Sequence, residues 1–276
     1  MHPRYLTAPV RITGPNIFGL PSSILFSPTP NPGWYWKFHP DYPPIPATRA
    51  LVGSNLRRLT LRFCGHTLQI YEHIGSLRWT GLDGVIVSAS GFPPYTGRPW
   101  ECWKQLRRST ATNGTQALPW IQFDEPLTVR YPNAPDRYLA YQPGNHEMLE
   151  IHIIVDFPGL GRVERQYLLP LQSLDLILKA RTLGWPPHWY YPSAIGGALG
   201  LWRHHKWIAW PQTCAADDLL EEIANHRAGD LLGALSLVFH DKLLSGKIIS
   251  HCAGHWADAQ LLRHMSKQLQ CLSAQP

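Results

Sequence analysis

The segment ADDLLEEIANHRAGDLLGALSLV, residues 216–238, is the most informative stretch of the chain. Its apolar residues recur at helical spacing, and Ile223, His226, Asp230 and Leu237 fall on one face of the predicted helix. His226 and Asp230 are polar interruptions of a face that otherwise favours burial. Side chains four residues apart converge on a helix, so one helix can present two metal ligands in this way. The spacing fits a hydrogen-bonded His–Asp pair in a core equally well, and both interpretations stay open at this point.

Apolar patterning on both sides of this helix predicts an α+β fold. The first 60 residues are broken by prolines, which cannot donate to the interior of a sheet, so we expect short strands joined by turns there. Small polar residues at 109–116 are typical of a linker. Strands followed by helices, twice along the chain, indicate two similar-sized layers. The other predicted elements are strands at 59–70, 85–87, 149–157, 163–169 and 247–250, and helices at 72–81, 171–180 and 255–270.

The composition excludes several classes of protein. With 276 residues, 44% of them apolar and only 16% charged, the chain can bury a core and is neither disordered nor collagen-like. The net charge is +6, but no run of five Lys or Arg occurs, so we expect no nucleic-acid partner. The five cysteines never form a Cys-x-x-Cys pair, which favours free thiols in a reducing compartment. Because the residues show neither a signal peptide nor an 18-residue apolar stretch, we expect a soluble, cytoplasmic protein.

A second informative pair, Glu72 and His73, stands where a strand pattern gives way to a helix. Catalytic zinc takes three protein ligands and keeps one position open for water. His73, His226 and Asp230 would make such a set, and Glu72 could then deprotonate the water. An exposed acidic residue in the first turn of a helix is the ordinary alternative for Glu72.

The third informative segment is Ala253-Gly254-His255, where a strand pattern ends and a helix pattern begins. Gly254 permits a close approach of the backbone to a ligand. A histidine at a helix N-terminus can act as a general acid or as an oxyanion partner, and the helix dipole there lowers its pKa. His255 is therefore a candidate for proton transfer.

Four stretches in this order resemble the UDP-3-O-acyl-N-acetylglucosamine deacetylase family, the zinc amidases of lipid A synthesis. Three of their motifs are a Glu-His segment with a Gly-Leu-Asp turn, an Ala-Arg-Thr segment and a His-x-x-x-Asp helix. The fourth is a Gly-His segment that opens a long closing helix. The stretches are EHIGSLRWTGLDGVIV from Glu72, ARTLGW from Ala180, HRAGDLLGALSL from His226 and SHCAGHWADAQLLRHM from Ser250.

The resemblance implies a fold of two similar β-α-α-β domains that pack through their helical layers. The active site would lie at the interface between them. Placed on this sequence, the domains span 1–112 and 113–276, and an aromatic-rich insert lies near 185–210 of the second domain. The family likeness also implies a monomer.

The resemblance assigns roles residue by residue. Zinc would be held by His73, His226 and Asp230, and Glu72 would be the general base. Zinc lowers the pKa of a bound water towards 7, while a base and an acid handle protons on opposite sides of the amide. The remaining roles are oxyanion stabilisation for Thr182, protonation of the leaving amine for His255, and substrate contact for Arg227, Leu183 and Gly254.

The chain also departs from the family pattern. Arg227 stands where the family has Lys, which keeps a cation but changes its contact geometry. Ala234 stands where the family has a second Asp that supports its catalytic histidine, so we expect His255 to lack a counter-ion and to be a weaker base. Phe18 replaces a family histidine, and the turn at 95–98 replaces an Asp-Gly-Ser turn.

The aromatic-rich insert bears on the substrate. Its bulky rings would fill or reshape the apolar groove that a long acyl chain needs, or would simply pack the insert against its own domain.

From the resemblance as a whole we expect a zinc-dependent N-deacetylase of an N-acetylglucosamine-containing small molecule, acylated or nucleotide-linked, working near a membrane surface. The alternative is a zinc-binding paralogue without turnover that binds a nucleotide sugar or a protein partner.

Overall fold

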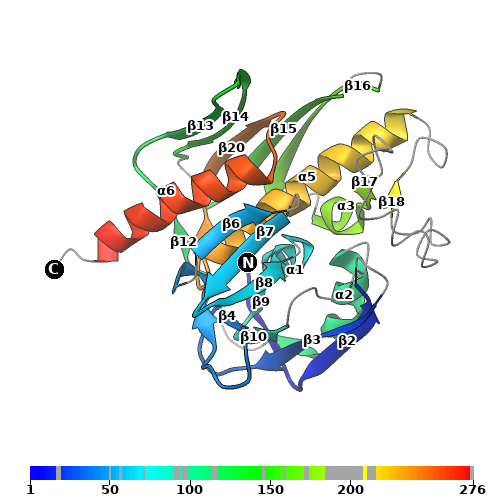
Figure 1. Cartoon of the computed structure of the whole chain (residues 1–276), viewed down its shortest axis with the longest axis vertical. Helices are drawn as coiled ribbons and strands as arrows, with labels where there is room; N and C mark the ends of the chain where they lie inside the picture. Colours follow the sequence, from blue (N-terminus) through cyan, green and yellow to red (C-terminus); the bar gives the residue numbers. More distant parts are fainter. Residues whose placement is uncertain are drawn as a thin grey trace.

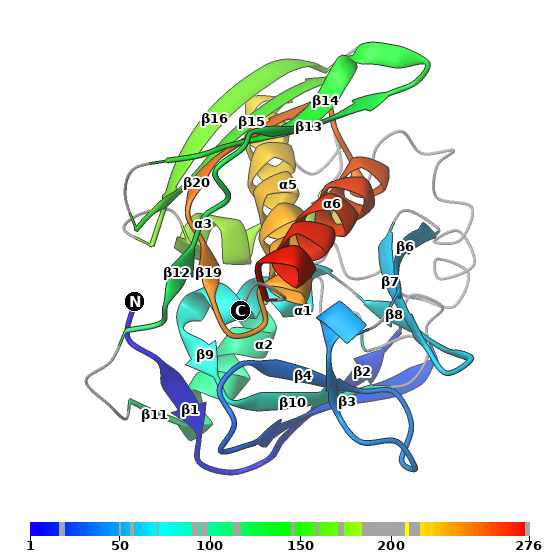
Figure 2. The ribbon, with the colours of Figure 1, turned by 90° about the vertical axis from the view of Figure 1, so that its left-hand side faces the viewer.

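The protein has a mixed α+β fold, as the sequence predicts. In the computed structural model, two five-stranded sheets lie on opposite sides of a layer of helices (Figure 2). The residues described are 1–16, 20–49, 51–55, 58–70, 72–89, 94, 99–112, 117–144, 147–157, 160–170, 174–183, 208–209 and 216–273.

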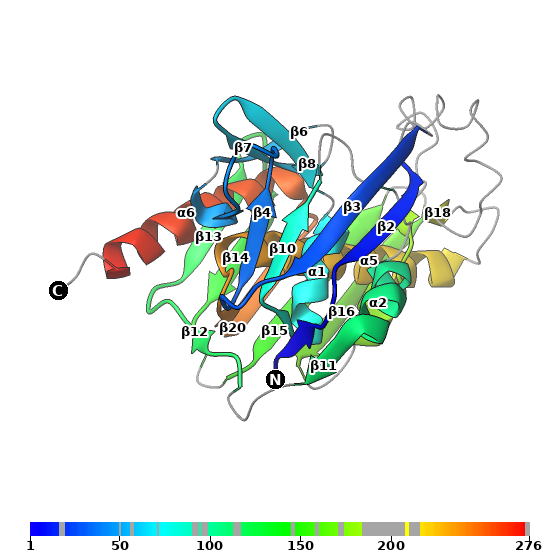
Figure 3. The ribbon, with the colours of Figure 1, turned by 90° about the horizontal axis from the view of Figure 1, so that it is seen from below.

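The first sheet is built from the proline-rich N-terminal part of the chain. It has the order β2-β3-β10-β4-β5, and Figure 3 shows it in front of α1 and α2. Its inner face is aromatic, because Phe26, Trp34 and Trp36 are all fully buried. Two three-stranded sheets, β11-β1-β9 and β6-β7-β8, accompany it. The bounds are β1 Arg4–Leu6, β2 Val10–Pro15, β3 Pro21–Pro28, β4 Trp34–Lys37, β5 Ile45–Pro46, β6 Leu51–Asn55, β7 Arg58–Phe63, β8 His66–Ile70, β9 Leu82–Asp83, β10 Val85–Ser88 and β11 Thr110–Thr112.

The second sheet has the order β13-β14-β20-β15-β16. Strand β15 pairs in parallel with β20 and antiparallel with β16. Leu149, Ile151 and Ile153 alternate along β15 and are fully buried, as the period of two in the sequence predicts. The bounds are β12 Trp120–Ile121, β13 Leu127–Tyr131, β14 Ala134–Gln142, β15 Leu149–Phe157, β16 Gly161–Leu169, β17 Thr182–Leu183, β18 Ile208–Ala209, β19 Leu243–Leu244 and β20 Gly246–His251.

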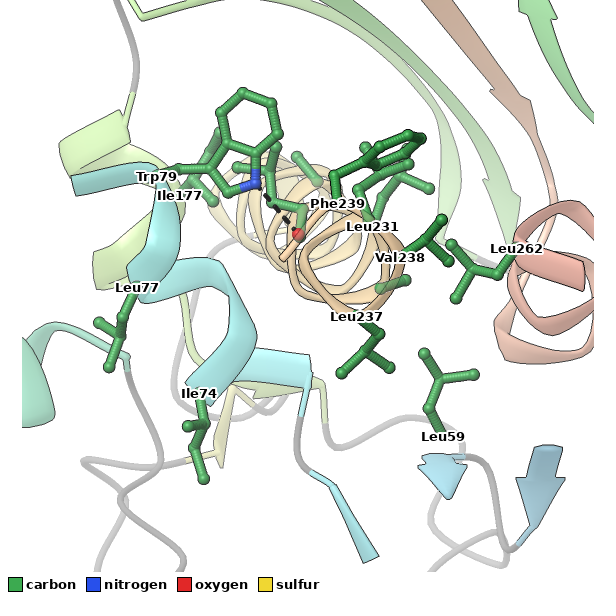
Figure 4. Close-up of a cluster of buried hydrophobic side chains, with 14 of the residues drawn as sticks. Leu59, Ile74, Leu77, Trp79, Ile177, Leu231, Leu237, Val238, Phe239 and Leu262 are labelled. Atoms are coloured by element: carbon green, nitrogen blue, oxygen red, sulfur yellow. Dashed lines mark hydrogen bonds between the residues drawn. The ribbon is translucent and has the colours of Figure 1, made fainter. Parts of the chain in front are cut away.

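The helical layer is centred on α5, which runs across the molecule beside α6 (Figure 1). Its residues 227–238 are all buried, as expected of a helix in the middle of a core. Figure 4 shows apolar side chains of α5 between Leu77 and Trp79 on one side and Leu262 on the other. The indole N–H of Trp79 donates to the carbonyl of Leu232 at 3.1 Å and ties the two segments together. The helices are α1 Glu72–Ser76, α2 Pro99–Leu106, α3 Leu174–Lys179, α5 Ala216–Val238 and α6 His255–Ser273, with 3-10 turns η1 Ala47–Arg49, η2 Leu77–Thr80 and η3 Arg107–Ser109.

Two glycines let α1 lie directly against the backbone of α5. A Cβ on Gly75 would stand 2.6 Å from the carbonyl oxygen of Gly233. A Cβ on Gly233 would stand 2.8 Å from the Cα of Glu72 and closer still to its carbonyl group. Any larger residue at Gly233 must push the two helices apart, so this crossing sets how far α1 stands from α5.

Several predicted elements are corrected in detail. The strand predicted at 59–70 is a hairpin, because the chain turns at Cys64 and Gly65, whose φ angles are 46° and 79°. The linker predicted at 109–116 begins with strand β11, which pairs with β1, and 113–116 lie outside the described residues. Helix α2 was not predicted at all.

The two-domain division at 112/113 stays a prediction. Within the described part of the chain, every strand pairs only with strands from its own side of that boundary. The cysteines described, Cys64, Cys102 and Cys252, form no disulfide, in line with the expected free thiols. Of the helices described, none has the length and apolarity needed to span a membrane.

Candidate metal and catalytic site

Three separate helices bring metal-ligating side chains to one place. Glu72 opens α1, Asp230 lies in the middle of α5, and His255 opens α6. One ligand atom from each of these residues lies within 4.8 Å of the other two. The close crossing of α1 over α5 makes this possible, because Gly233 contacts the backbone of Glu72 only one turn beyond Asp230.

His226 joins this group as the helical spacing predicted. Its Nε2 atom lies 3.5 Å from Oδ2 of Asp230, and the histidine side chain is 17% exposed. His255 reaches the same carboxylate oxygen with its own Nε2 atom at 3.7 Å. His226 and Asp230 therefore form the close pair that both interpretations required, and further acid and imidazole groups converge on it.

Glu72 is a buried acid and not the exposed helix-start residue of the ordinary alternative. It is 4% exposed, and its Oε1 atom accepts a hydrogen bond from the backbone N–H of Leu59 in β7. Burial raises the pKa of Glu72, the charge of His255 opposes this, and the charge of Asp230 adds to it. The carboxyl group can therefore hold a proton at a higher pH than an ordinary glutamate.

The expectation that His255 is a weaker base is wrong. Its Nδ1 atom lies 3.4 Å from Glu72 and 3.4 Å from Asp258. Burial lowers the pKa of His255, but the carboxylates of Glu72, Asp230 and Asp258 outweigh burial and raise the pKa to about 9. Carboxylates from α1, α5 and α6 therefore take the place of the acid that is missing at Ala234.

Asp258 is the residue that sequence reasoning missed. Its side chain is fully buried, and both of its oxygens accept hydrogen bonds from the guanidinium of Arg227, at 2.5 and 2.7 Å. Burial raises the pKa of Asp258, but Arg227 and His255 more than offset this and hold the pKa below its usual value. The available signal was the spacing, since an acid three residues after His255 lies on the same face of α6.

Arg227 is buried and bound within the chain. Besides the pair with Asp258, its Nε–H donates to the hydroxyl of Ser250 in β20 at 3.2 Å. Burial lowers the pKa of Arg227, but the charge of Asp258 prevails and raises it. The predicted contact of Arg227 with substrate stays a prediction, while the structure uses its donors to join α5, α6 and β20.

The charges of the site fit a divalent cation. Glu72, Asp230 and Asp258 are buried acids, and Arg227 is the buried cation among them. Three carboxylates against one guanidinium leave two negative charges when the histidines are neutral, and one when His255 is protonated. Buried charges in proteins are paired or coordinate metals, and imidazole nitrogen with carboxylate oxygen is a donor set that suits zinc.

The structure describes the remaining predicted residues only in part. The backbone of His73 follows Glu72 in α1, and Thr182 and Leu183 form β17, but their side chains lie outside what the structure describes. The N–H of Gly254 donates to the hydroxyl of Tyr131 at 3.0 Å. Also outside the described residues are Phe18, the turn at 95–98 and nearly all of the insert at 185–210.

Comparison with known proteins identifies the family of the chain. The model of one protein family, described as UDP-3-O-acyl N-acetylglycosamine deacetylase (LpxC), matches residues 4–267. This range includes all the site residues named above. No curated protein matches the chain significantly. Because the family match spans nearly the whole chain, the protein belongs to the UDP-3-O-acyl N-acetylglycosamine deacetylase family.

Proposed function

We propose that the protein is a zinc-dependent N-deacetylase that removes the acetyl group of an N-acetylglucosamine-containing substrate. The substrate is UDP-3-O-acyl-N-acetylglucosamine or a related amino sugar, and the products are acetate and a free amine. The observation that carries the proposal is the convergence of Glu72, Asp230 and His255 in a buried, negatively charged site. The family membership supports the reaction type.

His73, His226 and Asp230 are the proposed zinc ligands. Zinc at this position would polarise the amide carbonyl and lower the pKa of the attacking water. The excess negative charge of the site supports a cation there, and the 3.5 Å approach of His226 to Asp230 supports their joint action.

Glu72 is the proposed general base. It is buried, lies beside the proposed ligand Asp230, and has a raised pKa. A carboxylate with a raised pKa retains an accepted proton more readily, which suits a group that takes a proton and later passes it on. The hydrogen bond from Leu59 holds the carboxylate in place.

His255 is the proposed general acid. The carboxylates of Glu72, Asp230 and Asp258 raise the pKa of His255 to about 9, so its imidazole carries a proton at neutral pH and can give it to the leaving amine. The proposal further gives Thr182 the role of stabilising the oxyanion and gives Arg227, Leu183 and Gly254 contacts with substrate. It also includes a cytoplasmic location and a monomeric state, which cell fractionation and analytical ultracentrifugation test.

The test combines metal content with acetate release. Protein purified without chelator is assayed on UDP-3-O-acyl-N-acetylglucosamine and on UDP-N-acetylglucosamine. We expect one zinc per chain, no turnover with zinc retained in Glu72→Gln, and loss of zinc in His226→Ala. His264→Ala is the matched control, because His264 is an exposed histidine of α6. Unchanged turnover in both Glu72→Gln and His226→Ala would refute the proposal.

A zinc-binding paralogue without turnover is the second candidate, and Ala234 is the observation that favours it. It predicts stoichiometric zinc and thermal stabilisation by a nucleotide sugar without release of acetate. The contact of Asp258 with His255 weighs against it, because the histidine has a carboxylate partner after all. Acetate release that depends on Glu72 would eliminate this candidate.

A further inference from the structure

The buried side chain of Asp258 links the proposed acid His255 to Arg227. We propose that Asp258, held by Arg227, is a positioning residue that orients the His255 imidazole towards the reacting centre. The inference rests on the proposed deacetylase function, which it deepens by adding two residues that act through His255.

Asp258 contacts both His255 and Arg227. Its Oδ2 atom lies 3.4 Å from Nδ1 of His255, one helical turn before it in α6. The same carboxylate receives two parallel hydrogen bonds from the Arg227 guanidinium, so it cannot rotate freely. Arg227 is held in turn by Ser250, which makes the assembly span α5, α6 and β20.

A carboxylate held beside Nδ1 leaves the other ring nitrogen for the reaction. A carboxylate beside one imidazole nitrogen favours a proton on that nitrogen and fixes which way the ring faces. The other ring nitrogen of His255, Nε2, faces Asp230 at 3.7 Å. Glu72 also lies 3.4 Å from Nδ1, but its proposed work as a base changes its charge, whereas Arg227 keeps Asp258 ionised.

The arrangement explains two departures from the family pattern together. Ala234 removes an acidic partner from α5, and Asp258 supplies a carboxylate from α6. Arg227 replaces a lysine, and only a guanidinium can grip both oxygens of Asp258 in a bidentate fork.

Three variants test the proposal in the full-length, zinc-loaded protein. Asp258→Asn keeps the shape of the side chain and removes its charge, while Arg227→Lys keeps the charge and removes the fork. Asp175→Asn is the control, because Asp175 forms an exposed ion pair with Lys179 on α3. Turnover, KM and zinc content are measured, and the His255 ring nitrogens are followed by ¹⁵N-histidine NMR, assigned with His255→Gln.

For Asp258→Asn we expect kcat to fall roughly 10- to 100-fold, the usual effect of losing a partner that orients a site histidine. KM and zinc content should stay within about twofold, and the His255 nitrogen signals should shift. Arg227→Lys should lower kcat less and shift the same signals. The control should change none of these quantities.

The outcomes separate this inference from the proposed function. Unshifted His255 signals in both variants overturn the inference, whether or not the protein deacetylates anything. A wild-type protein that releases no acetate refutes the proposed function, and the NMR signals then still decide the positioning role. If kcat falls together with the zinc content and the cooperativity of unfolding, Asp258 has a purely structural role. This result also overturns the inference. If Asp258→Asn does not fold, the His255 nitrogen signals of Arg227→Lys decide whether the inference holds.

Discussion

The glycine crossing between α1 and α5 makes a sharp prediction for Gly233→Ala. In the wild-type protein the backbone of α5 lies against the backbone of Glu72, the proposed base. An added methyl group has no flexible side chain to displace, because its nearest neighbours are main-chain atoms of α1. The substitution must therefore move Glu72 and His73 away from Asp230 and His226.

The size of the effect follows from the geometry. The new Cβ would lie 2.8 Å from the Cα of Glu72, and ordinary contact begins at 3.4 Å, so α1 must shift by at least 0.6 Å, and by more to clear the carbonyl. Overpacking of a core typically costs about 1–3 kcal/mol, against about 1 kcal/mol gained from replacing glycine within a helix. Misplacement of a catalytic group by about 1 Å can cost on the order of 100-fold in rate.

Gly229→Ala is the matched control for this experiment. It lies one turn earlier in the same helix and gains the same helix propensity. Its Cβ would lie 3.3 Å from the Cγ2 methyl group and 3.8 Å from the carbonyl oxygen of Ile177, so a movement of a few tenths of an ångström relieves the contact. We expect Gly229→Ala to keep wild-type turnover and to be at least as stable as the wild type. Gly233→Ala should lose both turnover and stability, as measured by acetate release and by urea unfolding. Equal turnover and equal urea midpoints in the two variants would refute the reasoning about this crossing.

Three further predictions concern charge and metal. Metal-free protein should lose stability as the pH rises from about 6.5 to about 9, because the raised pKa of His255 stabilises the fold only while its imidazole is protonated. Urea unfolding in EDTA measures this, and a pH slope unchanged in His255→Gln would contradict it. Glu72→Gln should stabilise metal-free protein at pH 7, because it removes a carboxylate that is costly to bury, as the raised pKa of this group indicates. A lower urea midpoint than wild type would show that its pairing with His255 outweighs burial. Zinc at 100 times its dissociation constant should stabilise the protein by about 2.7 kcal/mol. Calorimetry should show the loss of this stabilisation in His226→Ala.

Local spacing was enough to predict much of the molecule. The helix predicted at 216–238 has those bounds, and the strand predicted at 149–157 also agrees with the structure. Their periods of 3.6 and 2 are properties of consecutive residues. The convergence of His226 and Asp230 follows from the same local geometry, since both lie on one helix. The family likeness then assigned Glu72 and His255 to the same site, which no spacing within a single element could do.

The environment of His255 could not be derived in that way. Local sequence offered a helix dipole and the missing acid at Ala234, and both lower its basicity. The pKa of His255 is raised because Glu72 and Asp230 arrive from two other helices, and Asp258 is fixed by an arginine 31 residues away. The hairpin at Cys64 and the backbone contact at Gly233 are likewise decided by packing. Periodicity therefore reports which elements form, whereas charge and proton affinity depend on distances between elements, which exist only once the chain has folded.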